Sequence, residues 1–229
     1  MGIGKAKERV RIVGTIPYKN KAGQRRPGIT TLLSSQCAWG SRGLHWWWND
    51  QGLKGRNMQE AQAEVTIPGI IAHLMLEAYW KNESPNLSEF SKEDIDKAEN
   101  SFVNFLHWVD SNKIVPIEIE PHLFSEKYQV GGTPDLIAES VHGLVVVDYK
   151  TGRIYDSSLL QFHFYTLVWE ENHPDRLLTG GIYGLRIPRD QEVPSFHHSY
   201  WAKLPKEATE AIEYLIGLKR CQGVLKKLL

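Results

Sequence analysis

Apolar residues recur with helical spacing through the first half of the chain. The spacing predicts an aromatic-rich helix over about residues 30–49 and a stronger one over about residues 58–81. Pro68-Gly69 offers an alternative start for the second helix, since proline suits the first helical turn. A third amphipathic helix is predicted over residues 92–112. The first half of the protein is therefore expected to be helical.

The pattern then changes to the alternation typical of strands. Three strands, with a hairpin turn at His142-Gly143, are expected at residues 114–120, 128–138 and 143–149. The later elements are expected to be a helix at 157–171, strands near 181–187 and 196–201, and a helix from about 206 to 218 or beyond. This order predicts an α/β fold with a central mixed β-sheet flanked by helices.

Composition limits the class of protein. The chain has 229 residues, 41% of them hydrophobic and 24% charged, which suits one folded domain. No apolar run is long enough to cross a bilayer, and the N-terminus lacks the apolar stretch of a secretory signal. Cys37 and Cys221 are isolated and form no disulfide framework. We expect a cytoplasmic protein without a membrane partner.

Charge is balanced overall but unevenly distributed. Lysine plus arginine and aspartate plus glutamate each number 27. Residues 1–26 hold eight basic residues and one acidic residue, and residues 218–229 hold four basic residues and no acidic one. Basic ends around an acidic centre suit a protein that grips a polyanion at its rim and holds cations at its centre. An ordinary solvated surface with basic tails is the alternative.

Candidate chemistry gathers around two predicted strand ends. Asp148 ends the apolar run Val145-Val146-Val147, and Lys150 follows two residues later on the same sheet face. Asp135 begins the neighbouring strand, so strand pairing can bring the two carboxylates together. Close carboxylates repel unless a divalent cation lies between them, and oxygen ligands favour Mg²⁺ or Mn²⁺ over zinc. Unrelated charges, with Asp148 and Lys150 as a surface pair, are the alternative.

These residues resemble the motifs of the PD-(D/E)XK nuclease superfamily, and in particular its RecB-like exonuclease branch. The pattern G-x-x-D is matched at 132–135, (D/E)-x-K at 148–150 and Q-x-x-x-Y at 161–165. The resemblance implies that Asp135, Asp148 and the backbone carbonyl of Tyr149 bind metal and that Lys150 is catalytic. Gln161 and Tyr165, which share one helix face, would complete the catalytic site and contact nucleic acid; a core tyrosine beside an exposed glutamine is the alternative.

A fourth motif lies upstream. Residues 69–77 fit the family pattern G-x-x-x-H-x-x-x-E, which makes His73 a metal ligand that Glu77 could orient. A core histidine is the alternative. Glu118 and Glu120 are further candidate ligands. Strand alternation places both on one face, and the sequence does not distinguish between them.

Several upstream residues are expected to bind nucleic acid. Residues 27–34 resemble the family opening P-S-V-T-x-x-L-S, with Gly28 in place of its serine. Basic side chains before the first two helices could contact phosphates or add only non-specific affinity. The expected nucleic-acid-binding residues are Arg25, Arg26, Thr30, Thr31, Ser34, Lys54 and Arg56. Trp46-Trp47-Trp48 could stack on bases or join the core, whereas His197-His198 is expected to be structural.

The sequence therefore predicts a deoxyribonuclease that uses one or two Mg²⁺ or Mn²⁺ ions. The resemblance favours an exonuclease acting on single strands or duplex ends in the cytosol of a phage host or other bacterium, together with a recombination or annealing protein. Two cysteines are too few for the iron–sulfur cluster of one branch of the family. The expected organisation is a basic segment, residues 1–26, and a single nuclease domain, residues 27–229. The rivals are a structure-specific or nicking endonuclease, an inactive nucleic-acid-binding module and a metal hydrolase of another substrate class.

Overall fold

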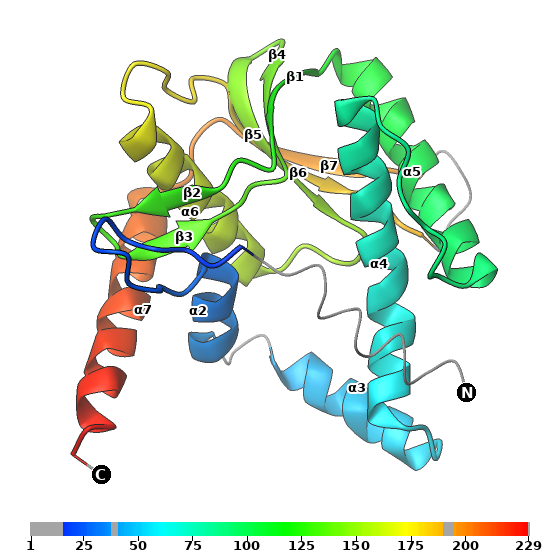
Figure 1. Ribbon diagram of the computed structural model, residues 1–229, viewed down its shortest axis with the longest axis horizontal. Helices are drawn as coiled ribbons and strands as arrows, with labels where there is room; N and C mark the ends of the chain where they lie inside the picture. The colour runs from blue at the N-terminus through cyan, green and yellow to red at the C-terminus, as the bar shows by residue number, and fades with distance from the viewer. Residues whose placement is uncertain (1–15, 38–40, 190–194, 229) are drawn as a thin grey trace.

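The computed structural model describes residues 16–37, 41–189 and 195–228 (Figure 1). The basic residues Lys5, Lys7, Arg9 and Arg11 lie outside the described residues. The helices are α2 (Ile29–Gln36), α3 (Ser41–Leu53), α4 (Met58–Lys81), α5 (Lys92–Asn112), α6 (Asp156–Asn172) and α7 (Lys206–Leu225). The strands are β1 (Val115–Ile119), β2 (Leu123–Ser125), β3 (Val130–Gly132), β4 (Leu136–Ser140), β5 (Gly143–Lys150), β6 (Gly181–Arg186) and β7 (His197–Trp201). None of these helices is long and apolar enough to cross a membrane.

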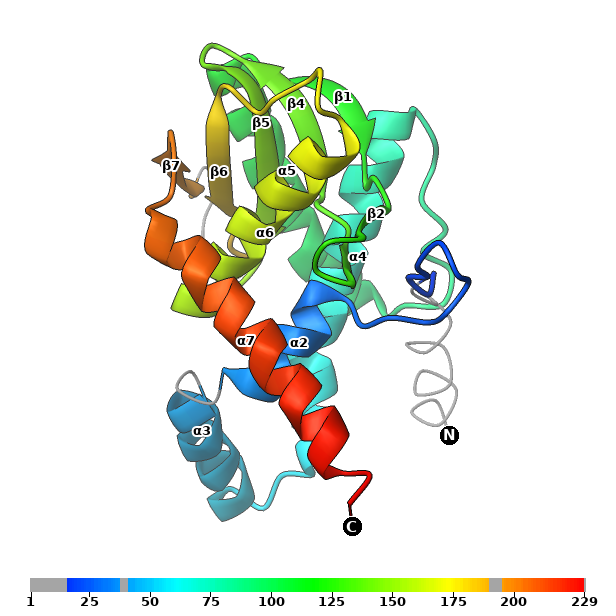
Figure 2. The same ribbon diagram turned by 90° about the vertical axis from the view of Figure 1, so that its left-hand side faces the viewer.

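A five-stranded sheet forms the centre of the molecule, with the strand order β1-β4-β5-β6-β7. β5 pairs in parallel with β6, and the other neighbouring strands of this sheet pair antiparallel. Helices cover both faces (Figure 2). The predicted α/β fold with a mixed central sheet is therefore confirmed.

β5 connects two hydrophobic cores. Val145 and Val147 point into the core formed with α4 and α5, whereas Leu144 and Val146 point into the core formed with α2, α6 and α7. Residues 144–147 of β5 are apolar without interruption, as is usual for a central strand with both faces covered. Asp148 and Lys150 continue the second face and carry charge to the end of the strand.

Three predicted elements differ in the structure. The predicted strand 128–138 is two strands in different sheets: β3 pairs with β2, and β4 pairs with β1 and β5. Pro134 lies between them and has no N–H to donate, so it interrupts the strand. The predicted helix 30–49 is two helices, and α2 ends at Gln36. α4 is continuous through Pro68, so Pro68-Gly69 does not mark its start.

Two glycines position the loop and the helix that flank the site. A Cβ on Gly131 would lie 1.9 Å from the Tyr18 ring, so only glycine lets the segment from Tyr18 to Gly28 pack directly on β3. Pro27 O accepts a hydrogen bond from Gly131 N at 3.0 Å in the same contact. A Cβ on Gly132 would lie 2.8 Å from the Tyr165 ring. The close approach of β3 to α6 therefore explains the glycine that begins the G-x-x-D motif.

The substitution Gly132→Ala is expected to reduce the free energy of unfolding by about 1–3 kcal/mol, because the new methyl group must displace buried aromatic rings. Gly217→Ala is the matched control, since nothing lies within 4 Å of a Cβ built there in α7. That control should gain up to about 1 kcal/mol, because alanine favours the helix. Urea unfolding measures both; equal stabilisation by the two substitutions would show that β3 and α6 can separate freely.

Candidate metal centre

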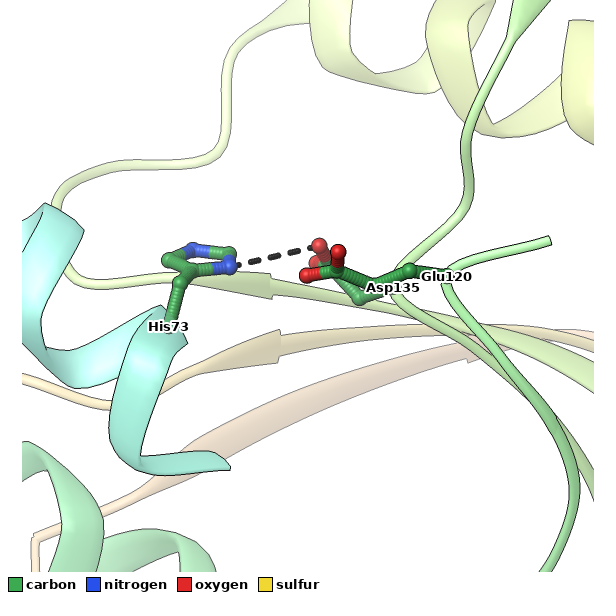
Figure 3. Close-up of side chains that lie close together, drawn as sticks. All are labelled: His73, Glu120 and Asp135. Carbon is green, nitrogen blue, oxygen red and sulfur yellow. Dashed lines mark ion pairs between the residues drawn. The ribbon is translucent and has the colours of Figure 1, made fainter. Parts of the chain in front are cut away.

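Three side chains from separate elements converge at one end of the sheet (Figure 3). His73 comes from α4, Glu120 follows β1 and Asp135 precedes β4. Their potential ligand atoms all lie within 4.8 Å of one another, and His73 Nδ1 is 3.3 Å from Asp135 Oδ1. Among the described residues, these three alone form such a group of histidine, cysteine or carboxylate side chains. An imidazole and two carboxylates therefore meet where the motifs predicted a metal.

Backbone geometry places Glu120 in this group and keeps Glu118 out of it. Glu120 has φ +48°, in the left-handed region, and its N–H donates to Asp135 O at 3.1 Å. This conformation interrupts the strand alternation. Glu118 Oε1 lies 3.9 Å from Arg176 Nη1, beyond the end of α6, whereas Glu120 lies beside His73 of α4. The expectation that both glutamates share one face is wrong, and Glu120 is the one at the site.

A close contact between α4 and the end of β5 positions His73. A Cβ on Gly69 would lie 3.0 Å from Thr151 Oγ1, just past the end of β5, so glycine allows α4 to approach the strand end one turn before His73. Glu77 makes an ion pair with Lys81 rather than contacting His73. Glu77 was expected to orient His73, but the structure does not show this contact. The imidazole of His73 lies next to Asp135 instead.

Asp148 and Lys150 form a second charged pair beside the first group. The Asp148 side chain is 3% exposed, and its Oδ2 lies 2.5 Å from Lys150 Nζ. Despite this short ion pair, Oδ2 has no hydrogen bond of normal geometry within the described residues. Burial raises the pKa of Asp148 to about 6, against the opposing effect of Lys150. The alternative of an exposed surface pair is excluded, because this carboxylate is buried.

The two aspartates have opposite electrostatic environments. Burial acts to raise the pKa of Asp135, but His73 and Lys150 outweigh it and the pKa is lowered. Tyr149 N–H also donates to Asp135 Oδ2 at 2.6 Å, which stabilises the ionised form. For Lys150, burial acts to lower the pKa, and the carboxylates of Asp148 and Asp135 raise it instead. The site thus holds an ionised Asp135, a charged lysine and a second carboxylate that ionises with difficulty.

Glu120 is the other strained carboxylate. Burial, followed by the charges of Glu77 and Asp135, raises its pKa to about 7. A divalent cation would relieve this repulsion together with that at Asp148, because opposite charge favours the ionised form. The donor set and the buried, incompletely paired Asp148 oxygen therefore fit a bound divalent metal.

Gln161 links the lysine to two other elements. Its Oε1 accepts from Lys150 Nζ at 3.4 Å, and its Nε2 donates to Tyr165 OH at 2.6 Å and to Thr30 Oγ1 at 3.3 Å. Tyr165 is also a buried core residue that packs near Gly132. Tyr165 therefore packs in the core and also contacts Gln161 beside Lys150, and its role in catalysis stays a prediction.

The other expected nucleic-acid contacts lie outside the group of side chains described above. Thr31 and Ser34 are exposed on α2, and Arg25 is exposed on the loop that packs against β3. Lys54 pairs with Asp50 at 2.7 Å, and Arg56 pairs with Glu64. Those basic groups are therefore held by acidic neighbours of α3 and α4.

Two of the aromatic expectations are also resolved. His198 Nδ1 accepts from Trp108 Nε1 at 3.1 Å, so this histidine has the expected structural role. Trp46 and Trp48 are exposed and Trp47 is half-buried, so no member of the tryptophan run belongs to the core. The sequence did not single out Trp80, whose Nε1 donates to Tyr149 OH at 3.2 Å behind the site; a tryptophan on a predicted helix carries no signal for such a contact.

Acidic groups that could hold a cation, next to a lysine at the end of a mixed sheet, are typical of metal-dependent phosphodiesterases. A family model for the PD-(D/E)XK nuclease superfamily matches residues 44–220, and the chain belongs to that superfamily. The match includes His73 and all residues from Glu120 to Tyr165 described above. No curated relative matches the sequence.

Removal of the Glu120 charge should stabilise the metal-free protein at high pH. The folded-state pKa of about 7 exceeds the ordinary value of 4.5, so the stability that protonated Glu120 contributes is complete below pH 4.5 and is lost as pH rises through 7. In EDTA at pH 8, Glu120→Gln should therefore exceed the parent by about 1 kcal/mol, a figure reduced for solvent screening.

Urea unfolding in EDTA at pH 5 and pH 8 tests this expectation. The advantage of Glu120→Gln should be small at pH 5 and appear at pH 8. Glu118→Gln, two residues earlier but paired with Arg176, is the matched control and should show no such gain. The same difference at both pH values would mean that the charge of Glu120 is not under strain.

Proposed function

We propose that the protein hydrolyses DNA phosphodiester bonds in a reaction that requires Mg²⁺ or Mn²⁺. The observation that carries the proposal is the meeting of His73, Glu120 and Asp135 beside the buried Asp148–Lys150 pair. Membership of a nuclease superfamily supports the reaction class. The substrate is DNA, because the family consists of nucleases and the basic loops suit a polyanion.

The ligands proposed for one or two ions are His73, Asp135, Asp148 and the Tyr149 backbone carbonyl, with Glu120 as an outer ligand. A set rich in oxygen favours Mg²⁺ or Mn²⁺ over zinc. When bound, such an ion supplies positive charge to a phosphate and makes hydroxide available near neutral pH. Asp135 suits the ligand role best on electrostatic grounds, because its surroundings keep it ionised.

Lys150 is proposed as the catalytic cation. Its Nζ stays protonated between Asp148 and Asp135 and can donate to a phosphate oxygen as negative charge develops there. Gln161 accepts from the same Nζ and is tied to Tyr165 and Thr30, so the three residues are proposed to hold Lys150 in position. Catalytic preorganisation of this kind removes the cost of orienting the charge during the reaction.

We propose an exonuclease of the RecB-like branch for the mode of attack. The proposed strand contacts are Thr31 and Ser34 on α2 and the four basic residues Arg25, Arg26, Lys54 and Arg56. Action on DNA ends in the cytosol of a bacterium or phage host, alongside a recombination or annealing protein, is the setting that this branch suggests. The nuclease domain is proposed to span residues 27–229, preceded by the basic segment 1–26.

The experiment for this proposal compares end-labelled linear DNA with relaxed, covalently closed circles, in Mg²⁺ and in EDTA. Linear DNA should be degraded only with Mg²⁺, and closed circles should survive. Asp148→Asn should be inactive yet folded, since it removes a buried charge that burial and the neighbouring Asp135 disfavour. Cleavage of closed circles would favour a structure-specific or nicking endonuclease with the same centre, and binding without any cleavage would favour an inactive module. Full activity in EDTA would exclude the metal mechanism.

His73→Ala should raise the Mn²⁺ concentration required for half-maximal activity by about tenfold or more, the scale of losing a ligand or its support. His163→Ala is the matched control, because His163 contacts Thr209 of α7 at 2.7 Å and lies on the opposite side of the sheet from α4. An unchanged Mn²⁺ requirement in His73→Ala would assign this histidine to packing alone.

Lys150→Ala should lower kcat by about two to three orders of magnitude while DNA affinity in Ca²⁺ changes little, because the lysine acts on charge that develops in the reaction. Lys81→Ala, which removes another lysine paired with a glutamate near the centre, is the comparison. Single-turnover rates and anisotropy titrations separate the two effects. Equal losses in rate and affinity for Lys150→Ala would make it a phosphate anchor instead.

A further inference from the structure

A pocket of about 240 Å³ lies outside the metal centre, where α3, the start of α4 and α5 meet. Both views place α3 beside the first turns of α4, away from the sheet (Figures 1 and 2). The residues that line the pocket include Trp47 and Gln51 from α3, Arg56 before α4, Glu64 in α4, Lys97 in α5 and Arg189 after β6. Arg56, which the sequence suggested as a phosphate contact, therefore lines a pocket together with residues from distant parts of the sequence.

The chemistry of this lining favours an anion with a flat apolar part. Arg56, Lys97 and Arg189 line the pocket together with one carboxylate, that of Glu64. Lys97 also pairs at 2.8 Å with the exposed Glu93, which lies outside the lining, so a phosphate would compete with a solvated carboxylate for this lysine. Trp47 is half-buried, so part of its ring is available, and an indole offers a stacking surface for any base. The cavity is smaller than the roughly 300 Å³ at which small-molecule pockets usually begin, which suits one unit of a polymer.

The lining is held in place before any ligand arrives. Arg56 donates to Gln51 Oε1 at 3.1 Å and pairs with Glu64, and Arg189 donates to Val65 O. Asn100 of α5 in turn donates to Arg189 O at 3.0 Å. These contacts join α3, α4, α5 and the segment after β6, so the cations are fixed on several elements instead of extending freely into solvent.

α4 sets the distance between this pocket and the metal centre. Ala61 and Val65 line the pocket, and His73 follows Val65 by eight residues on the same helix. At 1.5 Å per residue the separation along the axis is about 12–18 Å. Stacked nucleotides rise roughly 3.4 Å each, so about four or five of them span this distance.

We infer that the pocket binds one nucleotide of the substrate strand about four or five positions from the bond that is cut, with its base on Trp47 and its phosphate near Lys97 and Arg56. The inference rests on the proposed function for the identity of the strand. It adds a second point of attachment, and the enzyme should therefore favour strands long enough to reach from the metal centre to the pocket.

Two assays test the inference with fluorescein-labelled single strands. Anisotropy with a 12-nucleotide strand in EDTA reports binding without cleavage. Hydrolysis of a 12-nucleotide strand and of a trinucleotide, both in Mg²⁺, reports whether substrate length matters. Trp47→Ala and Lys97→Gln should each raise the Kd for the longer strand by about fivefold or more, the scale of one lost stack or contact. They should reduce kcat/KM for the longer strand and leave that for the trinucleotide unchanged.

Matched variants separate the pocket from general effects of charge and folding. Trp47→Phe should restore most of the affinity, because phenylalanine keeps a stacking face. Lys92→Gln removes an exposed lysine from the same helix as Lys97 and should change nothing. Glu64→Gln should tighten binding several-fold, because it removes the one carboxylate from the lining; a purely structural role for the Arg56–Glu64 pair predicts no gain.

Normal cleavage and affinity in Trp47→Ala and Lys97→Gln would overturn the pocket and leave the proposed nuclease function intact. Equal loss on the trinucleotide and on the longer strand would also overturn it, because the effect would then lie at the metal centre. If the protein cleaves no DNA but its binding of the longer strand depends on Trp47 and Lys97, the pocket stands and the proposed function fails.

Discussion

Burial of Asp148 close to Asp135 is the constraint on which the rest of the site depends. Two carboxylates cannot both be ionised at low solvent exposure without nearby positive charge. Lys150 supplies one such charge directly, and His73 supplies another at Asp135 when protonated. The remaining strain appears in the raised pKa values of Asp148 and Glu120. The structure therefore holds a group of oxygens whose electrostatic energy falls when a divalent cation binds.

The fold can sustain this strain because the elements that carry the charges are firmly anchored. β5 is buried on both faces, so its apolar residues fix the end of the strand where Asp148 and Lys150 stand. Gly69 and Gly132 permit close contacts of α4 with the end of β5 and of α6 with β3. Buried apolar area thus compensates for unfavourable electrostatics at one end of the sheet, as is common where function requires strained groups.

α4 connects the two regions that are proposed to bind the substrate. Its middle carries His73, and its first turns line the pocket that contains Trp47. A single continuous helix fixes the distance between them because its rise per residue is constant. The continuity of α4 through Pro68 therefore has a consequence beyond local geometry, since a break there would leave the pocket and the metal centre free to move separately.

The sequence by itself determined most of the fold and much of the site. Apolar periodicity predicted α4, α5, α6 and the strands of the central sheet, since burial of one or both faces imposes that pattern directly. Asp135, Asp148 and Lys150 were identifiable as candidates because each lies at the end of an apolar strand, whereas Gln161 was identifiable only through the resemblance of residues 161–165 to a family motif. Only the tertiary structure decided between Glu118 and Glu120, because the choice depends on a left-handed backbone conformation that ends the strand alternation. The partner of Glu77 and the meeting of Trp47 with Lys97 and Arg189 were likewise decided by packing between distant segments. Local patterns record which residues must be buried, whereas contacts across the chain depend on how the buried surfaces fit together.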